Sequence, residues 1–142
     1  MGYDKTRDLG LLLIRVMLAV VFIYHGQGKL FGGLDGFAGY LASMNVPAPK
    51  VAAFLAALSE VGGGLILLSG LFFRFTLPFV VFTMLVASFK AHAGKFSLQD
   101  GGMEYALTLA VITAALVLTG PGRLTLGRFL PSGLQRLSGE EV

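Results

Sequence analysis

The feature that most constrains this chain is an apolar run, Val51–Phe73, that is long enough to cross a lipid bilayer as a helix. A transmembrane helix needs about 20 predominantly apolar residues. Glu60 lies about halfway along this run and is its only charged residue. A carboxylate at that depth is costly, so intramembrane acids usually have a charged partner or a function. The run therefore predicts a membrane span containing one paired or functional glutamate.

Composition places the whole chain in the membrane. Of its 142 residues, 55% are hydrophobic and 13% are charged, and the mean hydropathy is +0.78. Soluble domains carry about 25% charged residues. Three further apolar segments predict four spans, at about 9–26, 51–73, 75–91 and 103–119. We therefore expect an all-α integral membrane four-helix bundle, a single domain over 1–142. Its tail, 120–142, is expected to be interfacial and then disordered.

Charge and cysteine usage exclude several functions. The chain has no cysteine, which rules out disulfides, thiol relays and thiolate ligands, and we expect no metal. Its 11 basic residues form no run, so they indicate membrane orientation rather than nucleic-acid binding. With the N-terminus inside, the basic residues divide into Lys5, Arg7, Arg74, Arg123, Arg128 and Arg136 inside and Lys29, Lys50, Lys90 and Lys95 outside. This division favours a multi-pass protein with both termini in the cytoplasm.

The first apolar run is expected to remain as a span. Arg15 interrupts it, and no small-x-small cleavage site precedes His25, so it does not resemble a cleavable signal peptide.

A short amphipathic helix is predicted in the connection between the first two spans, Gly26–Lys50. One apolar stripe follows the helical i, i+3, i+4, i+7 pattern at Phe37, Tyr40, Leu41 and Met44. Asp35-Gly36 precedes the stripe and Pro47-Ala48-Pro49 ends it. We expect this helix to lie on the outer membrane surface or to fold back as a lid. The alternative is an ordered loop without a function.

Helical rise suggests a partner for Glu60. Arg15 lies about 16 Å below the outer end of the first span, taken near Gly26, and Glu60 lies about 13 Å below Val51. The two side chains are expected to point into the bundle and form an ion pair, which either serves a function or only fixes helix packing. The sequence is compatible with an ionised, paired Glu60 and with a protonated one. The small residues that share its helix face are Ala53, Ala56, Ala57, Gly63 and Gly64.

Polar residues gather at the outer ends of the spans. They are His25, Lys29, Lys90, His92, Gln99, Asp100 and Glu104. For either histidine alone an interfacial hydrogen bond is the simpler reading, and Glu104 is most simply a helix cap. Together they predict a polar pocket that opens outward and is floored by the Arg15–Glu60 pair.

Five segments carry a family resemblance: Arg15–Phe31 with HGQGKLF, Glu60–Gly70, His92, Gly101–Leu109 and Gly120–Leu130. On these segments the chain resembles DoxX-like membrane proteins over nearly its whole length. Such proteins often have an aspartate after a Ser-Leu pair where this chain has Thr125-Leu126-Gly127. The resemblance implies a four-helix protein of the bacterial plasma (inner) membrane. It also implies oxidoreductase roles, since relatives include the quinone-reducing subunit of thiosulfate oxidation and members of oxidative-stress complexes.

A quinone-linked oxidoreductase component is the function we expect. His25, Glu60 and His92 are the candidate catalytic residues, because quinone reduction takes up protons. The candidate substrate-binding residues are Arg15, Lys29 and Glu104. The two cations among them would hold a quinol oxygen or an anionic donor. Electrons would pass directly between bound substrates or come from a membrane or peripheral redox partner.

Two other functions fit the sequence. One is a scaffold or assembly factor that docks partner proteins, and small residues on spans two and four suit contact within one chain or in a homo-oligomer. The other is a haem b site with His25 and His92 as axial ligands.

Overall fold

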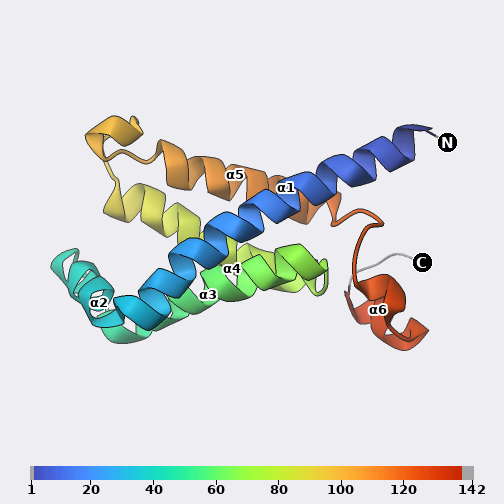
Figure 1. The fold of residues 1–142 in the computed structure, drawn as a ribbon. Coiled ribbons are helices and arrows are strands. Elements are labelled where there is room, and N and C mark those ends of the chain that lie inside the picture. Colours follow the sequence, from blue (N-terminus) through green and yellow to red (C-terminus); the bar gives the residue numbers. More distant parts are fainter. Residues whose placement is uncertain (1, 139–142) are drawn as a thin grey trace.

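The computed structural model describes residues 2–138, and these residues form helices and no strand. In chain order the elements are α1 (Gly2–Gln27), the π-helical turn η1 (Gly28–Gly32), α2 (Leu34–Ser43), α3 (Pro49–Ser69), α4 (Phe73–Val86), the π-helical turn η2 (Ala87–Ala91), the 3₁₀ turn η3 (Leu98–Asp100), α5 (Glu104–Thr119), the 3₁₀ turn η4 (Gly127–Phe129) and α6 (Ser132–Ser138). The predicted all-α architecture is confirmed (Figure 1). The end of the tail, 139–142, lies outside the described residues.

Three helical segments are long and apolar enough to cross a membrane: Asp4–Gly32, Pro49–Ser69 and Phe73–Ala91. Glu104–Thr119 is a shorter apolar helix and is the fourth helix of the bundle. The predicted second span, 51–73, was too long at its end. Gly70 and Phe72 both adopt left-handed backbone conformations, with φ of 77° and 52°, and this reversal ends α3 at Ser69 and begins α4.

The outer surface of the bundle is apolar. Each of the four long helices exposes large hydrophobic side chains, for example Met17, Leu65, Phe79 and Leu118. Exposed apolar surface on this scale is suited to lipid rather than to water. The protein is a membrane protein that lies in the bilayer.

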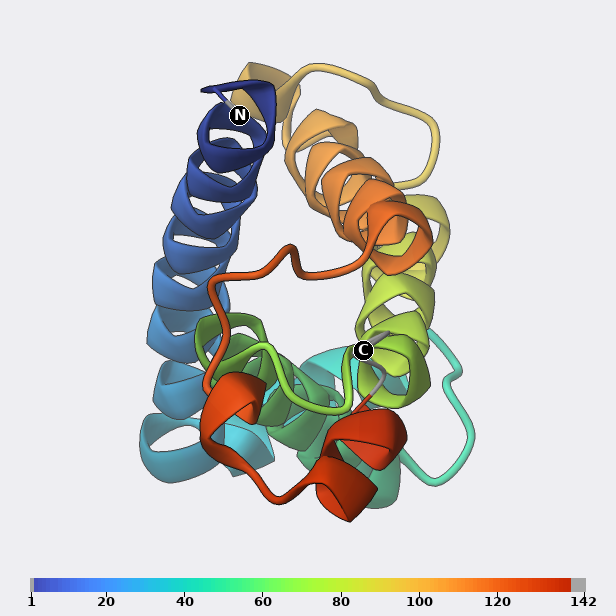
Figure 2. The same ribbon diagram turned by 90° about the vertical axis from the view of Figure 1, so that its right-hand side faces the viewer.

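The helices pack in the order α1–α3–α4–α5, and α1 touches α5 only slightly. Figure 2 shows α1 on one side of the bundle and α4 with α5 on the other. The small-residue face of α3 is buried as predicted: a Cβ on Gly63 would overlap Val80, and one on Gly64 would lie 2.5 Å from Ile23. Small residues therefore let α3 approach both of its neighbours closely.

The amphipathic helix predicted between the first two spans exists as α2 and ends at Ser43, before the prolines. It packs against α3 and buries Ala38. Its Tyr40 hydroxyl is 3.5 Å from the Ala91 carbonyl at the end of η2. Thus α2 crosses the end of the bundle that lies opposite α6 (Figure 1).

Arg15 is fully buried and joins α1 to the end of α3 and to the tail. Its Nε donates to the Leu67 carbonyl at 2.8 Å, and Nη2 donates to Leu68 at 3.1 Å. Its Nη1 donates to the carbonyls of Pro121 and Leu124, at 2.9 Å each. The last carbonyls of a helix have no intrahelical donor and carry partial negative charge, so a guanidinium suits this place. The start of the tail that follows α5 is therefore packed against the bundle.

Replacing Arg15 tests this clamp. Arg15→Lys keeps the charge but cannot present five donors in a planar fork, so we expect a loss of roughly 2–4 kcal/mol of stability. Thermal unfolding followed by circular dichroism in detergent measures it. Arg74→Lys, at an exposed position near the start of α4, is the matched control and should change little. Equal melting temperatures for the two variants would contradict the clamp.

Candidate functional site

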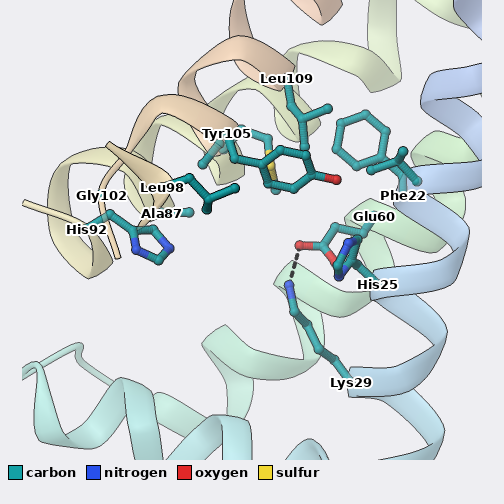
Figure 3. Close-up of a pocket in the computed structure, with 13 residues that line it drawn as sticks. Phe22, His25, Lys29, Glu60, Ala87, His92, Leu98, Gly102, Tyr105 and Leu109 are labelled. Atoms are coloured by element: carbon teal, nitrogen blue, oxygen red, sulfur yellow. Dashed lines mark hydrogen bonds and ion pairs between the residues drawn. The ribbon is translucent and has the colours of Figure 1, made fainter. Parts of the chain in front are cut away.

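One pocket of about 270 Å³ lies between α1, α3, α4 and α5, at the end of the bundle near α2. It contains a charged pair, two histidines and a tyrosine against otherwise apolar walls (Figure 3). Its lining residues are Val21, Phe22, His25, Lys29, Glu60, Met84, Ala87, His92, Leu98, Gly102, Tyr105, Ala106 and Leu109.

The partner of Glu60 is Lys29. The Lys29 ammonium lies 2.6 Å from Glu60 Oε1, and the side chain of Glu60 is 3% exposed while that of Lys29 is 32% exposed. The same ammonium lies 5.0 Å from the centre of the Phe37 ring on α2, within reach of a cation–π interaction. The ion pair thus links η1 to α3, and the contact with Phe37 extends it to α2.

The prediction that Arg15 forms an ion pair with Glu60 was wrong. The helix of the first span does not end near Gly26 but continues through η1 to Gly32, about 9 Å further at helical rise. Glu60 therefore lies level with Gly26, where an added Cβ would be 2.9 Å from the Glu60 Cβ. Arg15 is about 16 Å deeper along the same helix, and carbonyl groups hold it there.

Two pocket residues, Lys29 and His92, lie in or directly after π-helical turns at the ends of helices. Lys29 lies in η1, and His92 follows η2, with its backbone N–H donating to the Ala87 carbonyl. A π-helical turn inserts one extra residue into a helix and is frequent at functional sites. Both turns thus change the direction in which the residues after α1 and α4 face.

The two histidines meet the pocket in different ways. His92 Nδ1 lies 2.9 Å from the Gly101 carbonyl. A carbonyl oxygen only accepts, so Nδ1 carries the proton, and the other ring nitrogen of a neutral His92 is an acceptor. The His25 ring is held edge-on by Tyr24 and Tyr105, with centroid separations of 5.5 and 6.1 Å. His25 is exposed and lies at the seam between α1 and α5.

The structure brings together four of the six candidate residues, His25, Lys29, Glu60 and His92. Arg15 lies outside the pocket, at the end of α3. Glu104 also lies outside it and has the capping role that its position suggests: its carboxylate accepts from the backbone N–H of Leu98 and ties the preceding loop to α5. Neither residue lines this pocket.

Sequence reasoning missed the aromatic residues of the site. Tyr105 extends its hydroxyl into the pocket from α5, opposite Phe22 and Glu60 (Figure 3). It directly follows Glu104, and a tyrosine at the polar end of a span was the available signal. Within residues 2–138 no group of three or more His, Asp or Glu side chains could hold a metal ion.

These features define a four-helix membrane protein with an amphiphilic pocket near the end of the bundle where α2 lies. The DoxX family model matches residues 10–93, a range that includes Arg15, His25, Lys29, Glu60 and His92. The chain belongs to the DoxX family. No solved structure matches it.

Three relatives match over almost their full length. Inner membrane protein YqjF of Escherichia coli (strain K12) is 32% identical, covering 89% of this chain and 95% of the relative. Inner membrane protein YphA of the same strain is 28% identical, covering 89% and 94%. The protein named "Putative oxidoreductase CatD" of Bacillus subtilis (strain 168) is 28% identical, covering 92% and 93%.

Two glycines of α1 and η1 test how the ion pair is positioned. Gly26→Ala should push α1 away from α3, because its Cβ would meet the Val61 backbone nitrogen at 2.9 Å as well as Glu60. We expect a loss of about 1–3 kcal/mol. Gly28→Ala, whose Cβ would meet nothing within 4 Å, should leave the melting temperature nearly unchanged. A Gly26→Ala protein as stable as Gly28→Ala would show that the close approach is dispensable.

Proposed function

We propose that this protein is a quinone-binding component of a membrane oxidoreductase, located in the bacterial plasma membrane with both termini in the cytoplasm. The observation that supports the proposal most directly is the Lys29–Glu60 pair, with its buried carboxylate, at one end of a largely apolar pocket. Ligand sites of this kind combine apolar walls with a few convergent polar groups. The name of the relative CatD points to the same class of activity.

The pocket suits the headgroup of a quinone. Its volume, about 270 Å³, is near the lower end of the range of about 300–1,000 Å³ for ligand pockets, which suits one substituted ring rather than a whole lipid. Phe22, Met84 and Leu109 supply apolar walls, and Tyr105 and Lys29 supply donors for ring oxygens. An isoprenoid tail would leave through the loosely packed seam between α1 and α5 into the bilayer.

A bound quinone supplies two-electron chemistry that is coupled to two protons. The residues of this chain that can hold or move a proton beside it are His25, Glu60 and His92, from three different elements. Lys29 stabilises negative charge on Glu60 and on a ring oxygen. The chain has no cysteine, and in this proposal the electrons pass directly between bound substrates or come from a redox partner.

The haem b alternative is disfavoured by the size of the pocket, because a cavity of about 270 Å³ is too small for a macrocycle among side chains that are already packed. The scaffold alternative is an outcome of the experiment below.

Native mass spectrometry of protein purified in mild detergent, together with an absorbance spectrum, tests the proposal. We expect a co-purified or added benzoquinone at about one molecule per chain and no visible haem band. Lys29→Gln should weaken quinone binding about tenfold, the usual order for a lost charge-assisted hydrogen bond.

Lys90→Gln is the control for this measurement, since Lys90 is an exposed lysine at the end of η2 that does not line the pocket. It should bind quinone as the unaltered protein does. A protein that binds no quinone but retains a second polypeptide would favour the scaffold and reject the redox proposal.

A further inference from the structure

The second carboxylate oxygen of Glu60 lacks a hydrogen-bond partner among residues 2–138, although it is buried. Lys29 contacts only Oε1. A carboxylate accepts hydrogen bonds through both oxygens and donates none, and leaving a buried charged acceptor unmatched is costly. Glu60 lines the pocket, but Oε2 itself has almost no accessible surface, so a ligand there supplies the missing donor once the carboxylate turns toward it.

A second acceptor faces the same space from the other side. His92 donates from Nδ1 to the Gly101 carbonyl, so its Nε2 is an acceptor in the neutral ring. Figure 3 shows His92 and Glu60 on opposite sides of the pocket, with Leu98 and Tyr105 between them. Glu60 Oε2 and, in a neutral ring, His92 Nε2 therefore each lack a donor from residues 2–138.

We infer that the pocket binds the reduced, hydroquinone form of its ligand more tightly than the quinone form. One hydroxyl donates to Glu60 Oε2 and the hydroxyl across the ring donates to His92 Nε2. A quinone has two carbonyl oxygens and no hydroxyl proton, so it would set lone pairs against both acceptors. This inference rests on the proposed function and adds the redox form that the site selects.

The preference has a measurable size. A ligand that donates a hydrogen bond to one buried charged acceptor should bind about tenfold or more tightly than a ligand that places a second acceptor there. Because the reduced form is bound more tightly, the midpoint potential of the bound couple is raised. A tenfold preference corresponds to about 30 mV for a two-electron couple.

The test uses the full chain in lipid nanodiscs and a short-tailed 1,4-benzoquinone with its hydroquinone, under anaerobic conditions. Isothermal titration calorimetry gives the two dissociation constants, and a redox titration of the bound couple gives the potential. We expect the hydroquinone to bind at least about tenfold more tightly, with a positive shift of about 30 mV or more.

Glu60→Gln should abolish or invert this preference, because an amide nitrogen at the Oε2 position donates to a quinone carbonyl. His92→Phe should reduce the preference without disturbing the Lys29–Glu60 pair, which keeps the inference testable if Glu60→Gln does not fold. Thr113→Val is the matched control, since it also removes a buried unpartnered oxygen from a span but lies outside the pocket. It should leave both dissociation constants unchanged.

The outcomes separate the inference from the proposed function. Binding of neither form by folded protein would overturn both. Quinone binding that equals or exceeds hydroquinone binding would overturn the inference alone. A hydroquinone preference that is retained in both Glu60→Gln and His92→Phe would also overturn it, because the selecting groups would then lie elsewhere.

Discussion

The structure depends first on how Arg15 is accommodated inside an apolar bundle. A buried guanidinium needs acceptors for its donors, and here they are main-chain carbonyls at the end of α3 and in the tail after α5. This arrangement places the charge at the negative end of a helix dipole and satisfies carbonyls that would otherwise lack donors. It also joins the first span to the segment after the last one, which closes one end of the bundle.

With Arg15 engaged at one end, the opposite end is organised by a different ion pair. Lys29 comes from a π-helical turn and Glu60 from the middle of α3, and Gly26 allows their backbones to approach. The pair is one-sided, because only Oε1 of Glu60 is engaged. An incomplete hydrogen-bond set in an otherwise apolar pocket marks a ligand site better than a fully satisfied pair would, since the latter is explained by packing alone.

The residues of the pocket come from segments far apart in the chain. Lys29, Glu60, His92 and Tyr105 lie on η1, α3, the end of η2 and α5. The helices α1 and α5 pack only slightly against each other. In the proposed function this seam is the route by which a ligand dissolved in lipid would reach the pocket.

The sequence by itself determined the membrane class, the four apolar helices, the burial of Arg15 and Glu60, and the clustering of His25, Lys29 and His92 at one end. These follow from hydropathy and helical periodicity, which are local properties of the chain. Only the tertiary structure decided the partners, because they depend on where helices end and how closely they approach. Because the first helical segment continues from α1 through η1 to Gly32, the ion-pair partner of Glu60 is Lys29 and not Arg15. The fold of the tail places the carbonyl groups that accept hydrogen bonds from Arg15. Tyr105 lines the pocket for the same reason, since the packing of α5 across from α1 turns its side chain inward. The spacing of residues in the sequence does not predict that packing.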